Sequence, residues 1–255
     1  MKISSWNVNS VNARMEHVKK YLAEYQPDIL MVQELKTQDF PEAEFKDTGY
    51  TCKAVGQKSY NGVAIFSRHD IKVIHTNLPG NDNDDQARYI EADIKGLRFI
   101  NIYLPNGNPV GTEKFNYKLG WMSHLKARLA DLRREQRPFA IGGDFNVIPE
   151  NKDCHDPKVW EGDALFRPES RALFRTMVNL GLTDALRVFN QKGEQYTFWD
   201  YQAGAWPQNK GIRIDHFLLS PELADRLEAC EIHKEPRGWD KPSDHTPIQI
   251  TLACD

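Results

Sequence analysis

The stretch Pro242-Ser243-Asp244-His245-Thr246-Pro247 places a carboxylate and an imidazole side by side, directly before Ile248–Leu252. That following segment alternates apolar and polar residues, which predicts a half-buried strand. Alone, an Asp-His pair at a strand start is typical of a turn with a satisfied side chain. However, four other apolar runs also end or begin in acids and amides, at Trp6-Asn7, Gln33-Glu34, Gly143-Asp144-Phe145-Asn146 and Ile214-Asp215. So many polar strand ends predict a shared functional site.

Length, composition and charge limit the class of protein. The chain has 255 residues, of which 40% are hydrophobic and 11% aromatic, enough for a large core. Its net charge of −3 disfavours a generally basic nucleic-acid binder, although DNA binding depends on a local patch. The widely spaced cysteines predict reduced thiols, not a disulfide frame or zinc site; they are Cys52, Cys154, Cys230 and Cys254.

Membrane and export signals are missing from the sequence pattern. No apolar run approaches the roughly 18 residues of a membrane helix, and the first residues carry no apolar signal core. A cytoplasmic protein without membrane contact is therefore expected.

Periodicity predicts one domain, spanning 1–255, in which strands and helices alternate. Strands are expected at 2–9, 29–32, 50–56, 62–67, 71–76, 88–94, 97–104, 139–141, 212–220, 228–234 and 248–252. Helices are expected at 11–25, 119–132, 168–180 and 221–227, and 147–167 is expected to be a long surface loop. The hairpin-like spacing in the middle favours mixed, partly antiparallel sheets over a ladder of βαβ units.

Glu34 follows a buried apolar run, where a carboxylate is costly unless it is paired or bound to a cation. Mg²⁺ is held in proteins by one or two carboxylates together with substrate phosphate oxygens. Glu34 is therefore a candidate metal ligand, with Asn7 or Asn9 adding a carbonyl oxygen. A strand-end glutamate facing solvent is an equal alternative.

Asp144 follows two glycines, which suit a strand end that opens onto a cleft. In an extended chain Asn146, two residues later, would point to the same side. An acid that activates water and an amide that holds an oxyanion suit hydrolysis. The structural alternative is an Asx turn at the strand end.

His245 needs an orienting acceptor if it is to act on a phosphate, and Asp215 is the preferred partner. Asp244 would point elsewhere in an extended segment and is free to serve a metal. Tyr103, at another predicted strand end, can donate to phosphate, although a core or rim tyrosine is the simpler interpretation. No glycine-rich phosphate loop with its lysine and no Gly-x-Ser-x-Gly motif is present.

Several of these segments carry a resemblance to a known family: Pro27–Lys36, Tyr103–Gly107, Gly143–Asn146, Asn209–Asp215 and Ser243–His245. In this order they resemble the exonuclease III family of abasic-site endonucleases, within the wider endonuclease/exonuclease/phosphatase (DNase I-like) superfamily. Gly-Asp-Phe-Asn and Asp-His are shared across the superfamily. Gln33–Lys36 and Gly211–Asp215 are much more specific for the DNA-repair branch.

The resemblance implies an α/β fold of the α+β type. It is a four-layer sandwich of two mixed, largely antiparallel sheets flanked by helices, with the site at one edge. It also implies a Mg²⁺ site, with Mn²⁺ as a candidate substitute. The implied ligands are Asn7 and Glu34, assisted by Asp244, with Asp144, Asn146 and His245 as further candidates.

The same resemblance implies catalytic roles. Asp144 would position and deprotonate the attacking water, and Asn146 would hold a phosphoryl oxygen. Asp215 and His245 would form a dyad on the scissile phosphate, and Tyr103 would contact the phosphate or help the leaving oxygen. Whether Asp144 or His245 is the general base stays open.

Substrate contacts are implied as well. Phe198, Ile212 and Ile214 would line the pocket for a base-free sugar, with Trp199 alongside. DNA backbone contacts are expected from Lys36, Asn106, Lys118 and Arg213. The chain departs from the family pattern at Ile212, where some members carry an aromatic residue, and at Ala185-Leu186 after Asp184. These departures leave the substrate preference open.

The implied activity is that of a Mg²⁺-dependent DNA-repair phosphodiesterase. It would cut 5′ to abasic sites and remove nucleotides or blocking groups from 3′ ends of duplex DNA, acting as a monomer. One alternative is another phosphoesterase of the superfamily, acting on inositol phosphates or sphingolipids. A second is a non-catalytic DNA-binding relative, which would have lost some of Glu34, Asp144, Asp215 or His245, and all four are present.

Overall fold

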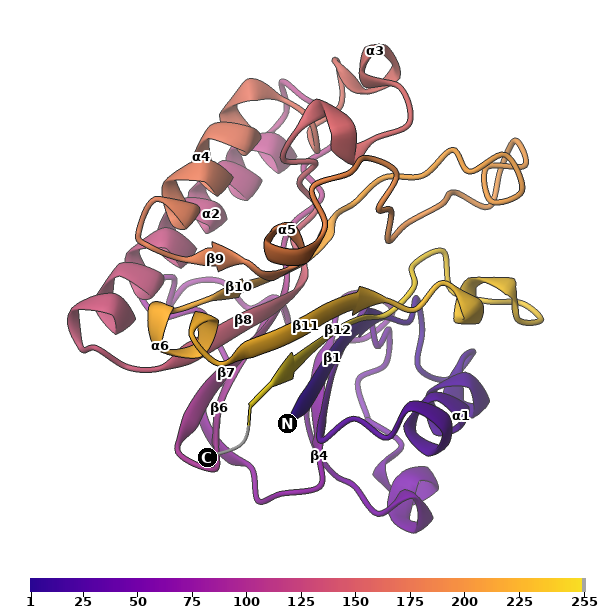
Figure 1. Ribbon diagram of the computed structural model, residues 1–255, viewed down its shortest axis with the longest axis vertical. Helices are drawn as coiled ribbons and strands as arrows, with labels where there is room; N and C mark the ends of the chain where they lie inside the picture. Colours follow the sequence, from indigo (N-terminus) through magenta and orange to yellow (C-terminus); the bar gives the residue numbers. More distant parts are fainter. Residues whose placement is uncertain (254–255) are drawn as a thin grey trace.

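The computed structural model describes residues 1–253, in which two six-stranded sheets pack face to face (Figure 1). The first sheet has the order β11 (Leu227–Ile232), β12 (Ile248–Leu252), β1 (Lys2–Asn7), β2 (Ile29–Gln33), β4 (Val63–Ser67), β3 (Thr51–Val55). The second has the order β5 (Lys72–His75), β6 (Tyr89–Ile94), β7 (Leu97–Tyr103), β8 (Phe139–Asp144), β10 (Asp215–Leu219), β9 (Thr183–Asp184). With helices on the outer faces, the expected four-layer sandwich is confirmed.

Strand direction decides where the polar strand ends meet. β1 and β2 run parallel and are connected through α1 (Met15–Tyr25), while β7 and β8 run parallel and are connected through α2 (Glu113–Arg134). A helical crossover returns each second strand in the same direction, so the carboxyl ends of each pair lie at one edge. β12 and β10 run antiparallel to β1 and β8, and their first residues therefore reach the same edges.

Three apolar layers hold the sandwich together. Between the sheets, buried side chains from both inner faces form one cluster, including Ile3, Met31, Phe99, Ala140 and Phe217. Outside the second sheet, α2 and α4 (Pro168–Val178) cover a cluster that includes Met122, Leu125, Leu129, Phe139 and Phe174. Outside the first sheet, α1 and the 3-10 helix η1 (Glu42–Thr48) cover Val18, Leu22, Leu30, Phe45 and Phe66.

A buried polar cluster also links the sheets. Asn101 Nδ2 donates to the main-chain oxygens of Val32 (3.0 Å) and Ala64 (2.8 Å) in the opposite sheet. Gln33 Nε2 donates to Asn101 Oδ1 (2.7 Å) and to Ser5 Oγ (3.1 Å). Unlike the apolar contacts, these directional bonds fix how one sheet is placed on the other.

The expected surface loop at 147–167 is wrong in part. It contains the 3-10 helix η2 (Asn151–Asp153) and the short helix α3 (Pro157–Trp160), and several of its side chains are buried. Ile148 and Leu165 pack against Ile212, whose segment forms only isolated bridges, so the expected strand at 212–220 begins at Asp215. Apolar contacts between these two irregular segments replace regular pairing.

Other short elements were not predicted or begin later than expected. The helix expected at 11–25 begins at Met15, and α6 covers Pro221–Ala224. The helices α5 (Ala185–Phe189) and η3 (Glu235–Gly238) carry no periodic signal because they are only a turn long. Cys52, Cys154 and Cys230 are free thiols, and Cys254 lies outside the described residues. Across residues 1–253, no helix combines the length and apolar character required to cross a membrane.

Candidate active site

The polar strand ends of both sheets meet at one place. Asn7 ends β1 and Glu34 follows β2 in the first sheet, while Asp144 ends β8 in the second. Asn7 Nδ2 donates to Glu34 Oε1 (2.9 Å) and to Asp144 Oδ2 (3.0 Å), so one amide bridges carboxylates from the two sheets. The segments that precede β10 and β12 project from the same edge, drawn in orange and yellow in Figure 1.

Asp215 and His245 form a second bridge between the sheets. His245 Nδ1 lies 2.8 Å from Asp215 Oδ2, and His245 Nε2 lies 3.7 Å from Asp144 Oδ2. Both acids and the imidazole are buried, with His245 only 4% exposed. Asp215 stands opposite Asp144 in the register of β10 with β8, which explains why both carboxylates reach one ring.

Burial and neighbouring charges set the protonation of this group. Burial alone would lower the pKa of His245, but the carboxylates of Asp215 and Asp144 outweigh it and raise that pKa to about 10. Burial raises the pKa of Asp144 to about 7, against the charge of His245. For Glu34, burial is outweighed by hydrogen bonds, led by that of Lys36, and its pKa is lowered. The site therefore joins an imidazolium to a carboxylate.

Three of these side chains could hold a metal ion. Glu34, Asp144 and His245 each offer a ligand atom, and the three atoms lie within 4.8 Å of one another. Two of the three donors are carboxylate oxygens, the ligands that hard divalent cations prefer. The donor set therefore fits a divalent metal ion.

Two residues expected as metal ligands are placed differently. Asn7 Oδ1 accepts the main-chain N–H of Asn9 (3.0 Å), so the amide turns its NH₂ group toward the carboxylates. Asp244 lines the cavity, but its Oδ1 accepts from Asn9 Nδ2 (3.1 Å), and it is not part of the three-residue group. In this structure Asn7 orients the acids, and Asp244 holds the Asn9 loop.

The backbone after Asp144 is not extended, contrary to the expectation from the sequence. Asn146 has φ +47°, and its main-chain N–H donates to Asp144 Oδ1 (2.8 Å), which is an Asx turn and not an extended segment. Asn146 Nδ2 donates to Leu104 O (2.9 Å), and its Oδ1 accepts from Asn106 Nδ2 (3.2 Å). Gly143 precedes this turn with φ +143°, and a Cβ there would lie 2.0 Å from the main-chain oxygen of Ile102.

A cavity of about 320 Å³ opens beside the acids. Its apolar wall consists of Phe198, Ile212 and Ile214 together with Trp160 and Leu165. Glu34, Tyr103, Asp144, Asn146 and His245 lie on its polar side, and burial raises the pKa of the Tyr103 phenol. Sequence reasoning missed Asn108, Trp160, Asp163, Leu165 and Asp200, which also line it. They lie in irregular segments or, for Trp160, in the one-turn helix α3, where no periodicity marks them.

Three expected substrate contacts are buried elsewhere. Lys118 is fully buried under the loop at 104–108, and burial lowers its pKa to about 7. Arg213, 1% exposed, pairs with Asp153 and Asp184 and holds the 147–167 loop against the chain before β10. Trp199 is also fully buried. None of these three side chains can reach DNA.

The two other expected backbone contacts stay near the surface. Asn106 is exposed and lines the cavity. Lys36 is partly exposed, and its Nζ lies 2.8 Å from Glu34 Oε2. Both can reach a bound strand.

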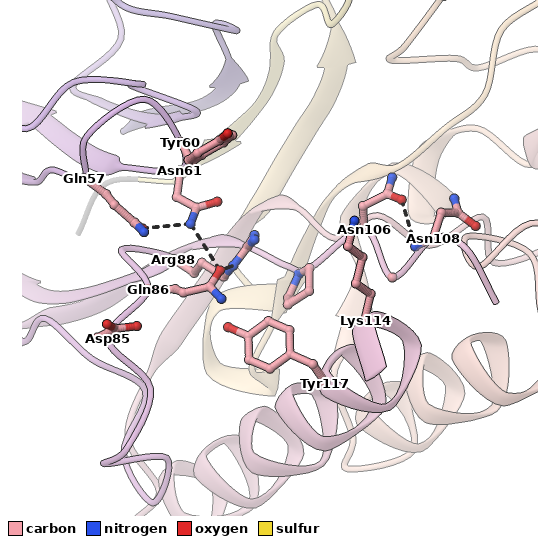
Figure 2. A pocket seen from close by; sticks show the side chains of 12 residues that line it. Gln57, Tyr60, Asn61, Asp85, Gln86, Arg88, Asn106, Asn108, Lys114 and Tyr117 are labelled. Carbon is pink, nitrogen blue, oxygen red and sulfur yellow. Dashed lines mark hydrogen bonds between the residues drawn. The ribbon is translucent and has the colours of Figure 1, made fainter. Parts of the chain in front are cut away.

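A larger neighbouring cavity, of about 570 Å³, shares Asn106 and Asn108 with the first. Figure 2 shows Lys114 and Tyr117 rising into it from α2, opposite a chain of hydrogen bonds through Asn61 and Gln86. In that chain Arg88 Nε donates to Gln86 Oε1 (2.8 Å). The loop that carries Asn106 and Asn108 divides the two cavities.

An α/β sandwich whose strand ends bring acids that could hold a metal ion beside an aspartate–histidine pair is the architecture of a phosphoester hydrolase. The chain belongs to the Endonuclease/Exonuclease/phosphatase family, whose model matches residues 4–245.

Relatives match along the whole chain. Exodeoxyribonuclease III of Haemophilus influenzae is 34% identical, covering 97% of this chain and 98% of that protein. Exodeoxyribonuclease of Bacillus subtilis is 30% identical, covering 99% of each. The structure of the 3′ phosphatase NExo from Neisseria, bound to a product DNA hairpin, has a TM-score of 0.96 at 38% identity over 100% of both chains.

An AP endonuclease from Archaeoglobus fulgidus gives a TM-score of 0.95 at 36% identity, again over 100% of both chains. The predicted family is thereby confirmed. The predicted activity, that of a DNA-repair phosphodiesterase, is confirmed as well.

Proposed function

We propose that this chain is a Mg²⁺-dependent phosphodiesterase of duplex DNA, which cuts 5′ to abasic sites and removes nucleotides or blocking groups from 3′ ends. The observation that carries the proposal is the convergence of Glu34, Asp144 and His245 within 4.8 Å, with Asp215 on the imidazole, at an apolar-walled cavity. The names of its relatives, which include exodeoxyribonuclease III, 3′ phosphatase and AP endonuclease, support this range of substrates.

The metal would be held by the carboxylate oxygens of Glu34 and Asp144, because the charged imidazole of His245 has no free lone pair for a metal. Oxygen donors favour Mg²⁺, for which Mn²⁺ can substitute. Such an ion supplies positive charge to the phosphate oxygens of the bound strand. Asn7 keeps both carboxylates oriented by donating to each of them.

The remaining chemistry falls to the aspartate–histidine pair and its neighbours. His245, held charged by Asp215, stabilises negative charge on the phosphate, so Asp144 is the better general base for the attacking water. Tyr103 and Asn146, on the polar side of the cavity, donate to phosphate or leaving oxygens.

The apolar wall is the part of the site that selects a sugar without its base. Phe198, Ile212, Ile214 and Leu165 offer no hydrogen-bond partners to a base edge but pack well against a deoxyribose. Removing a base also lowers the cost of turning the nucleotide out of the helix, because less stacking is lost. Both effects favour an abasic nucleotide over an intact one.

Flanking DNA would lie across the two cavities. Arg88 and Lys114 line the larger one, and Lys36 and Asn106 lie beside the acids. Contacts of this kind neutralise phosphates, so binding should weaken steeply with salt. We propose a monomer working in the cytoplasm.

The test is cleavage of a duplex with one synthetic abasic site, and of a second duplex with a 3′-phosphate end. With Mg²⁺, wild type should incise the abasic duplex and release phosphate from the 3′-phosphate duplex. With EDTA it should do neither. Asp144→Asn should lower the rate by at least about two orders of magnitude, the usual loss for a catalytic group. The matched control is Asp70→Asn, at an exposed aspartate, which should cleave like wild type.

Incision in EDTA, or full activity of Asp144→Asn, would refute the mechanism. Release of phosphate from inositol phosphates, without DNA cleavage, would favour the other phosphoesterases of the superfamily.

A further inference from the structure

The loop at 104–108 is the wall between the two cavities. Asn106 and Asn108 line both the catalytic cavity and the larger one. Figure 2 shows their side chains beyond the end of the row formed by Lys114 and Tyr117 on α2. The position of this loop determines one side of the space in which a phosphodiester would be held.

Lys118, on the same helix, reaches this wall from inside the protein. Its side chain has no exposed surface, and Nζ donates to the main-chain oxygens of Asn106 (3.0 Å) and Asn146 (2.5 Å). Asn106 belongs to the loop that follows β7, and Asn146 belongs to the turn that follows β8. A single buried amine therefore joins two site loops to α2.

The two loops also bond directly to each other. Leu104 N donates to Asp144 O (2.8 Å), Asn146 Nδ2 donates to Leu104 O (2.9 Å), and Asn106 Nδ2 donates to Asn146 Oδ1 (3.2 Å). These bonds keep the loops together but do not connect them to the helix beneath. The bonds of Lys118 add that connection.

The backbone above Lys118 is shaped to its side chain. Gly107 has φ +90°, and a Cβ at that position would lie 2.6 Å from Cδ and 3.1 Å from Cβ of Lys118. The loop can cross the methylene stem only where it has no side chain of its own. The methylene stem of Lys118 is therefore packed against the loop, and its amine is hydrogen-bonded to it.

The proton on Lys118 does not decide this arrangement. Its charged neighbours are Asp144 and Asp163, and burial is the main reason for its lowered pKa. A neutral amine keeps two N–H groups and can still donate to both carbonyl oxygens. The tie to the two loops therefore holds in either protonation state.

We propose that Lys118 is a positioning residue for hydrolysis. It holds Asn106 and Asn146 where their side chains can contact the phosphate, and it does not touch DNA itself. The inference rests on the proposed function, because the position of these two residues affects a reaction only if a phosphodiester is cleaved there. The alternative, expected from the sequence, is that Lys118 binds a DNA phosphate, and the two roles give opposite results in one experiment.

The experiment replaces Lys118 with Met, which keeps the stem and removes both donated bonds. The single-turnover cleavage rate at saturating enzyme should fall about 10- to 100-fold, the scale for a slightly misplaced catalytic group. The slope of log Kd against log salt, measured on uncleaved duplex, should equal that of wild type. The matched control, Lys126→Met on the same helix, removes the same charge and should keep the cleavage rate.

A slope reduced by about one, with the cleavage rate kept, would show that Lys118 contacts a phosphate and overturn the proposal. A wild-type cleavage rate with only a lowered melting temperature would overturn it too, because the role would then be purely structural.

Amide hydrogen exchange supplies a readout that does not need catalysis. Peptides covering 104–108 and 145–148 should exchange faster in Lys118→Met than in wild type or Lys126→Met, and unchanged exchange would also refute the inference. If wild type cleaves no DNA, the proposed function fails, but the exchange measurement still tests whether Lys118 holds the two loops. If Lys118→Met does not fold, Lys118→Gln serves the same measurements, because its amide nitrogen stands one bond short of the Nζ position and loses both bonds. A lower cleavage rate and faster exchange than in Lys126→Met support the role, and wild-type values overturn it.

Discussion

His216 makes the stability of this protein depend on pH in a way that can be calculated. It lies on β10 with no exposed surface, and its Nε2 is 3.0 Å from the main-chain oxygen of Val147. Its Nδ1 is buried without a hydrogen-bond partner within residues 1–253. Burial, followed by the charge of Arg213, lowers the pKa of His216 to about 4. A second proton at Nδ1 would therefore have no hydrogen-bond acceptor there, and the charges of Asp184 and Asp153 do not offset the cost of burial.

The size of the effect follows from the two protonation equilibria. An unfolded histidine has a pKa of about 6.5, so between about pH 6.5 and pH 4 the unfolded chain binds more protons at this residue than the folded one. Stability therefore rises with pH across that window and is lost as the pH falls. The loss due to His216 is about 2 kcal/mol between pH 7.5 and pH 5, and about 3 kcal/mol once the pH is below 4.

Urea unfolding at pH 7.5, 6 and 5 measures this loss in wild type and in His216→Gln, which keeps a neutral donor for Val147 but does not titrate. The variant will be less stable at every pH because its side chain fills less space, but its stability should fall by about 2 kcal/mol less over this range. Other titrating groups are common to both proteins and cancel in the difference. The control His124→Gln, at an exposed site on α2, should keep the wild-type slope. Parallel curves for wild type and His216→Gln would refute the reasoning.

Two further predictions concern the buried charges around the site. Arg213→Ala should lower the free energy of unfolding by about 3–5 kcal/mol, because it leaves the buried Asp153 without one of its two arginine partners. Urea unfolding measures this change. A loss below about 1 kcal/mol, the scale of a surface pair, would contradict the prediction. Asp215→Asn should lower the pKa of His245 by about 3 units, since charges about 4 Å apart interact by about 4 kcal/mol at an effective dielectric of about 20. The variant should then keep its imidazolium only below about pH 7, so pH–rate profiles should show a cleavage deficit that grows as the pH rises; an equal deficit at all pH values would contradict this.

The convergence of the polar strand ends could be predicted from the sequence, and the reason is topological. Glu34 and Asp144 each follow a short apolar run, and the helix before or after each run indicates a parallel crossover. Once two strands run parallel, their carboxyl ends share an edge whatever the loops do. Asp215 begins β10 and His245 precedes β12, and because these strands return antiparallel, both residues reach the same edges. Strand direction alone gives most of this geometry.

The roles of the charged residues behind the site could not be predicted, because their partners are far away in the sequence. Arg213 pairs with Asp153, 60 positions earlier, and Lys118 bonds to a carbonyl oxygen 28 positions later. Neither pairing leaves a local pattern, and a lysine on a basic helix is usually solvated. Asn146 was expected to be extended, but its main-chain bond to Asp144 Oδ1 fixes a left-handed turn. Local side-chain bonds of this kind compete with strand geometry and often win at strand ends.

The site is also an interface between the two sheets, and this explains why the core contains polar groups that an apolar sandwich would exclude. Asn7 and His245 come from the first sheet, and each bonds to an acid of the second, Asp144 or Asp215. A slip of one sheet over the other would break both bonds at once, and apolar contacts alone tolerate such slips. The buried bonds of Asn101 to main-chain oxygens of the opposite sheet oppose the slip directly. Hydrogen bonds in the core therefore hold the catalytic distances at the edge.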